Sequence, residues 1–170
     1  MKAVLALLHM VGFTFWVGGI FVYALVFTPS LRALVPAERG KLLEAYSKRF
    51  GLLTWVAVVL VVITGSLRTD RVIGFTNLLK FSTSYGNILL VKIILAAVLA
   101  FNGAYLGLKL APKMASFGPP SGGPKSSGPD AGGPPPGPPP GLLALQKRMS
   151  AHLWGSVGLS VVILLLTALL

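Results

Sequence analysis

The sequence contains no cysteine and very little negative charge. The absence of cysteine excludes disulfides, iron–sulfur clusters and thiolate ligation of haem or copper, so any metal or haem must be held by His, Met or oxygen donors. Four acidic residues stand against 15 Lys and Arg residues, a formal net charge of +11. Charged residues make up only 11% of the chain, whereas hydrophobic residues make up 54%. These proportions are typical of an integral membrane protein.

Long apolar segments account for most of the chain. A membrane-spanning helix needs roughly 20 predominantly apolar residues. Four segments meet this requirement, approximately residues 3–28, 50–68, 87–109 and 150–170. We therefore predict an all-α fold, an up-down four-helix bundle in the membrane, built as one domain. The first segment is too long for a signal peptide and has no convincing cleavage site, so we expect it to be retained.

The positive charges are concentrated in the first and third connections between these segments. Those two connections carry ten of the 15 Lys and Arg residues. The positive-inside rule therefore places them in the cytoplasm and both termini outside a plasma (inner) membrane. The basic character is explained by this topology, so we expect the lipid bilayer as a partner and no nucleic acid.

Local signals set the expected ends of the helices. Helix one is predicted to end near Pro29, and a new helix to start at Pro36 and run through a cytoplasmic extension into helix two. Asn87 is expected to cap helix three. Residues 115–141 are nearly all Gly, Pro and Ser, which predicts a disordered linker.

One cation lies inside an otherwise apolar run. Lys92 is surrounded by Ile, Leu, Val and Ala, and a charge near a bilayer centre costs at least about 2.5–3.5 kcal/mol on insertion scales. The helix rise of 1.5 Å per residue places Lys92 and His9 near the outer surface, at the level of Arg68. His152 falls at the cytoplasmic start of helix four, roughly 15–20 Å from His9 along the membrane normal. This separation argues against one haem held by both histidines.

The candidate ligands fall into two sets. A copper ion would use soft or borderline donors, whereas a haem b would use one axial histidine, an aromatic ring against the porphyrin and cations near its propionates. The copper set is His9, Met10, Met149 and His152, and the haem set is His9, Trp16, Arg68 and Lys92.

Several short blocks resemble the copper resistance protein D (CopD) family. They are residues 8–10, 16–19 and 27–32 (LHM, WVGG, FTPSLR), 46–51 and 63–65 (YSKRFG, ITG), and 85–92 (YGNILLVK). The resemblance implies a plasma-membrane protein in copper uptake or handling. The layout is also similar to that of HemJ-type haem proteins, in which a helix-one His and a helix-three Lys match His9 and Lys92. A second histidine of that group is replaced near Asn102, so HemJ-like catalysis is not expected.

Three functions follow from these patterns. The resemblance favours copper uptake or delivery at the plasma membrane, with a periplasmic copper or redox partner and without an enzymatic reaction. A haem-binding redox protein is the alternative, because Lys92 repels a bare cation but suits an anionic cofactor edge. The third is a structural or accessory membrane subunit in which the buried polar residues only fix helix register.

Overall fold

The computed structural model describes residues 2–34, 36–78, 80, 83–116 and 140–168. All regular structure in these residues is helical. Four helical stretches have the length and apolar composition to cross a membrane: Lys2–Ser30, Leu42–Val72, Ser84–Met114 and Leu143–Ala168. The predicted all-α membrane fold with four spans is confirmed.

The first span passes the proline at which it was predicted to end. Helix α1 (Lys2–Val22) continues through a π-helical turn, η1 (Tyr23–Phe27), into α2 (Thr28–Ser30) and a 3-10 turn, η2 (Leu31–Ala33). Thr28 donates from both its N–H and its hydroxyl to the Tyr23 carbonyl, the hydroxyl at 2.8 Å. The π turn shifts the hydrogen-bond register, and this shift accommodates Pro29, which has no N–H.

The second span belongs to one long helix. Helix α3 (Pro36–Val72) is continuous over 37 residues, as the predicted extension of helix two requires. Four stacked aromatic rings connect the first half of α3 with the η1 turn of the first span. The ring of Tyr46 stacks on Phe27 at a centroid distance of 3.8 Å and on Phe50 at 4.8 Å, and Tyr23 completes the stack.

A left-handed glycine ends α3. Gly74 has φ +75°, and its N–H and that of Ile73 both donate to the Thr69 carbonyl. A glycine at this position satisfies the last carbonyls of a helix without strain. The short α4 (Phe75–Leu78) follows.

The third span begins earlier than expected. Helix α5 (Ser84–Tyr105) is capped by Thr83, whose hydroxyl accepts the Gly86 N–H at 3.1 Å. The expectation that Asn87 is the cap was wrong, because Asn87 already lies in the first turn and donates its N–H to the Thr83 carbonyl.

The last two spans also extend beyond the predicted segments. Helix α5 continues through a π turn, η3 (Leu106–Leu110), into α6 (Ala111–Ser116), and α7 (Pro140–Ala168) starts ten residues before the predicted boundary at 150. The predicted linker at 115–141 lies chiefly outside the described residues.

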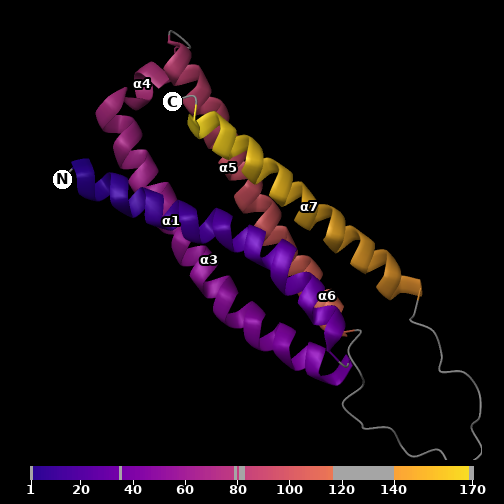
Figure 1. Cartoon of the computed structure of the whole chain (residues 1–170). Helices are drawn as coiled ribbons and strands as arrows, with labels where there is room; N and C mark the ends of the chain where they lie inside the picture. The colour runs from indigo at the N-terminus through magenta and orange to yellow at the C-terminus, as the bar shows by residue number, and fades with distance from the viewer. Residues whose placement is uncertain (1, 35, 79, 81–82, 117–139, 169–170) are drawn as a thin grey trace, which may run out of the picture.

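The helices associate as two pairs. Helix α1 packs along α3, α5 packs along α7, and α1 also contacts α7 (Figure 1). The start of α1 and the end of α7 lie at the end of the bundle that carries α4 (Figure 1). All four long helices contribute to one core, which contains Trp16, Val17, Ala57, Val58, Val61, Leu99 and Ile163.

Candidate functional site

His9 contacts α3 through a buried threonine. The ring Nδ1 of His9 lies 3.0 Å from Oγ1 of Thr64, which is 2% exposed. Gly65 provides the space for the ring, since a Cβ atom built there would lie 3.0 Å from Cε1 of His9. The first histidine is therefore held on the α1–α3 interface.

The hydrogen bonds of Thr64 define which nitrogen of His9 carries the proton. The Thr64 hydroxyl donates to the Leu60 carbonyl at 2.6 Å. A hydroxyl has one proton to give, so Thr64 accepts a hydrogen bond from Nδ1–H of His9. The lone pair on Nε2 of the neutral ring is left for another partner. A hydrogen bond that fixes the tautomer in this way is the usual outer contact of a histidine that binds metal.

Two cationic side chains contribute to the electrostatic environment of His9. Arg68 and Lys92 both interact electrostatically with the His9 ring, and Lys92 and Arg68 repel each other. Lys92 is half-buried, and no hydrogen bond or ion pair connects it with another residue in the described part of the chain. The neighbours of the intramembrane lysine are thus a histidine and an arginine.

His152 is held by a second polar cluster, between α5 and α7. Asn102 donates from Nδ2 to the His152 carbonyl at 2.9 Å and to Oγ of Ser156 at 2.7 Å. Its Oδ1 lies 2.6 Å from Nδ1 of His152. The carbonyl only accepts, which fixes the orientation of the amide, so Oδ1 accepts from Nδ1–H. His152 therefore has the same tautomer as His9, with Nε2 free of this cluster.

The surroundings of His152 are open on one side. Its ring lies 5.0 Å from that of Tyr105, tilted by 48°. A pocket of about 440 Å³ lies beside the cluster and is lined by His152, Asn102, Val98, Ala151, Gly155 and Leu159. This pocket opens on the α5–α7 surface, and its lining is mostly apolar, with His152 and Asn102 as the polar members.

The other predicted copper ligands are placed differently. Met10 is 61% exposed, and consecutive residues of a helix do not face each other, so Met10 is not directed at the His9–Thr64 contact. Met149 is half-buried and precedes His152 by three residues, a spacing that places both on one helix face. In the described residues no group of three or more His, Cys, Asp or Glu side chains is assembled for a metal ion.

The haem set fits poorly. Trp16 is 3% exposed and lies in the packed core, so its ring faces are already covered. Two glycines of the first helix pack closely against α3. A Cβ atom at Gly12 would lie 3.0 Å from Val61, and one at Gly19 would lie 2.8 Å from Phe50. These glycines accommodate neighbouring side chains and leave no slot for a porphyrin.

Sequence reasoning missed the two residues that orient the histidines. Thr64 and Asn102 are polar residues in apolar helices, and this property was the available signal. Their partners depend on which helices pair, and the sequence does not provide that information.

Comparison with known proteins identifies one family. A family model described as copper resistance protein D matches residues 44–132, more than half of the 170-residue chain. Neither the curated proteins nor the solved structures gave a match. The matched segment includes Thr64, Arg68, Lys92 and Asn102 but neither histidine. The similarity to HemJ-type proteins stays a prediction.

Proposed function

Because the chain belongs to the copper resistance protein D family, we propose that this multi-pass membrane protein takes up or delivers copper, which it carries as cargo. The observation that supports the proposal is that both histidine rings are held through the same nitrogen, Nδ1. Each ring is held by Thr64 or by Asn102, and Nε2 is the nitrogen that would bind the ion. Neutral imidazole and thioether are donors that copper prefers.

The proposed binding points are separate. His9 is held between α1 and α3, His152 between α5 and α7, and their polar partners differ. With the orientation expected from the charge distribution, His9 lies toward the periplasm and His152 toward the cytoplasm. Copper from a periplasmic partner would be accepted at one point and passed to the other.

The two points are expected to differ in affinity. Arg68 and Lys92 repel a bare cation at His9. His152 faces an open pocket whose lining contains no Lys or Arg, and Met149 shares its helix face. We therefore assign the tighter copper point to His152 and Met149, and the weaker one to His9 without Met10, which is exposed and directed elsewhere.

Copper titration of the purified full-length protein tests this proposal. Cu(I) would be added in detergent with a competing chelator, and metal content and absorbance would be recorded for wild type, His9→Ala and His152→Ala. We expect two copper ions per chain in the wild type and one in each variant. Met149→Leu should weaken binding more than Met10→Leu. Both variants binding copper as the wild type does would overturn the proposal.

The same spectra distinguish the remaining functions. A Soret band lost in His9→Ala would establish haem. A protein with neither copper nor a Soret band, but with variants of lower stability, would have a structural or accessory role.

A further inference from the structure

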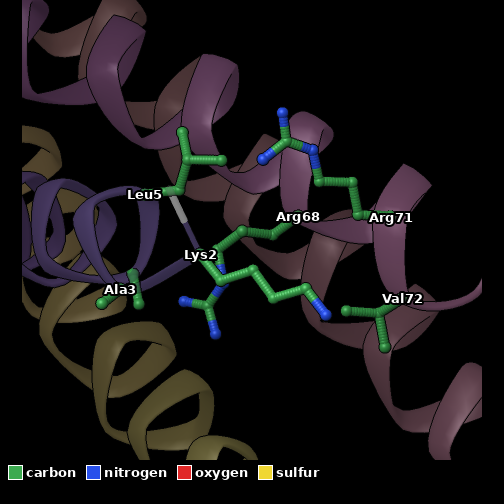
Figure 2. Close-up of a pocket in the computed structure, with 7 residues that line it drawn as sticks. Lys2, Ala3, Leu5, Arg68, Arg71 and Val72 are labelled. Atoms are coloured by element: carbon green, nitrogen blue, oxygen red, sulfur yellow. The ribbon is translucent and has the colours of Figure 1, made fainter.

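A basic pocket lies where the first helix begins and the long third helix ends. Its volume is about 390 Å³, and it lies between α1 and α3 (Figure 2). Three cationic side chains and four small or apolar ones form its walls: Lys2, Arg68, Arg71, Ala3, Leu5, Ala6 and Val72.

Cationic charge exceeds acidic charge around this pocket. The nearby Asp70 is exposed, does not line the pocket and forms no ion pair among the described residues. None of the lining residues is acidic. Within the described ranges, Lys2, Arg68 and Arg71 form no ion pair, since the salt bridge that is present joins Lys48 and Glu44 near the other end of α3. Lys92 adds further positive charge next to Arg68. Three or four cations with no acidic partner attract an anion.

The charged ends of the three cationic side chains point in different directions (Figure 2). Arg68 and Arg71 are three residues apart on α3 and therefore share a face. Figure 2 shows the Arg68 guanidinium extending toward α1 beside Lys2, whose amine lies near Val72, while the Arg71 guanidinium points away from both. A guanidinium donates two parallel hydrogen bonds to phosphate oxygens, and an ammonium adds a third donor.

The position of the pocket favours a lipid as the source of that anion. Two candidate spans terminate at it, Lys2–Ser30 by its first residue and Leu42–Val72 by its last. The pocket thus lies at the boundary between the apolar core and the headgroup region. Leu5 and Val72 supply an apolar wall beside the cations, along which an acyl chain would lie.

We propose that this pocket binds a phosphate group, and that the group is the headgroup phosphate of an anionic phospholipid. Arg68 holds the phosphate oxygens, Lys2 and Arg71 contribute charge at the rim, and Leu5 and Val72 contact the acyl chain. The proposal does not rest on copper binding, because neither histidine lines this pocket. Arg68 links the two sites electrostatically, since it also acts on His9.

Lipid binding by the full-length protein tests the proposal. The protein in detergent would be titrated with phosphatidylglycerol, with phosphatidylcholine and with inorganic phosphate, and the bound species counted by native mass spectrometry. We expect phosphatidylglycerol to bind more tightly than phosphatidylcholine. Removing one cation, in Arg68→Gln or Lys2→Gln, should weaken phosphatidylglycerol binding about fivefold.

A matched variant controls for the loss of net charge. Lys48 and Arg49 are exposed residues near the other end of α3, so Lys48→Gln/Arg49→Gln removes two charges without altering the pocket. This variant should bind phosphatidylglycerol as the wild type does. Competition by millimolar inorganic phosphate would assign the site to free phosphate. Equal binding of both lipids, or equal loss in the control and in Arg68→Gln at unchanged thermal stability, would overturn the proposal.

Discussion

Asn102 on α5 holds His152 on α7 by two contacts, Oδ1 to the ring Nδ1 at 2.6 Å and Nδ2 to the carbonyl oxygen at 2.9 Å. A third bond, to Ser156 one turn further along α7, continues the same connection. One amide thus determines both the rotation of α7 against α5 and the tautomer of the histidine.

Replacing this amide should loosen the α5–α7 pair. Asn102→Leu keeps the branching of the side chain but removes all three hydrogen bonds, and interhelical bonds in membrane proteins contribute about 0.6 kcal/mol each on average, up to about 1.7. We expect the free energy of unfolding to fall by about 1–3 kcal/mol, measured by SDS titration in mixed micelles. Val98→Ala, at an exposed position one turn earlier, is the control and should have little effect. Unchanged stability of Asn102→Leu would contradict the described network.

Two serines on α7 provide a matched comparison. Ser156 accepts a hydrogen bond from Asn102 at 2.7 Å, whereas the hydroxyl of Ser160, at 0% exposure, has no partner among the described residues. Ser156→Ala should lower the free energy of unfolding by about 0.5–1.5 kcal/mol. Ser160→Ala should leave it unchanged or raise it by up to about 1 kcal/mol, because it removes a buried, unpaired hydroxyl. The same SDS titration applies, and equal losses in the two variants would contradict this assignment.

Two glycines on α1 test how closely the first pair of helices packs. A Cβ atom at Gly12 would lie 3.0 Å from Val61 and 3.2 Å from the Ala57 carbonyl oxygen, whereas one at Gly18 would meet no atom within 4 Å. A backbone oxygen does not move aside, so Gly12→Ala should cost about 1–3 kcal/mol of stability. Gly18→Ala should change it by less than about 0.5 kcal/mol. Thermal unfolding in detergent measures both, and a Gly12→Ala protein as stable as Gly18→Ala would show that the helices are further apart.

The spans were predictable, but the environment of each histidine was not. Hydropathy depends on composition alone, so four apolar segments were visible in the sequence. Which helix packs against which is decided only in the folded bundle. Asn102 appeared rotated away from the inward face of helix three, yet in the structure it lies at the centre of the contact with α7. Trp16 was assigned to the haem set as the aromatic ring against the porphyrin, but in the structure it is enclosed by core residues.

The most direct test of the proposed copper chemistry is at Thr64. Thr64→Val keeps the shape of the side chain but removes the hydroxyl that accepts Nδ1–H of His9. The Val61 backbone then remains as a hydrogen-bond partner of the ring, and the preference for a proton on Nδ1 weakens. We expect nitrogen NMR of labelled histidine to show a mixture of tautomers at His9 and a single tautomer at His152. Copper affinity at the His9 point should fall about 10–100-fold, as is typical when an outer contact of a metal-binding histidine is lost.

Thr64→Ser is the matched control, because it retains the hydroxyl and should keep both the tautomer and the affinity. The second histidine serves as an internal standard, since its tautomer is fixed by Asn102 on a different pair of helices. Loss of affinity at both points in Thr64→Val would indicate general unfolding. Loss at the His9 point alone, with restoration in Thr64→Ser, requires that the hydroxyl acts through the imidazole. A Thr64→Val protein with wild-type affinity at both points would exclude that role.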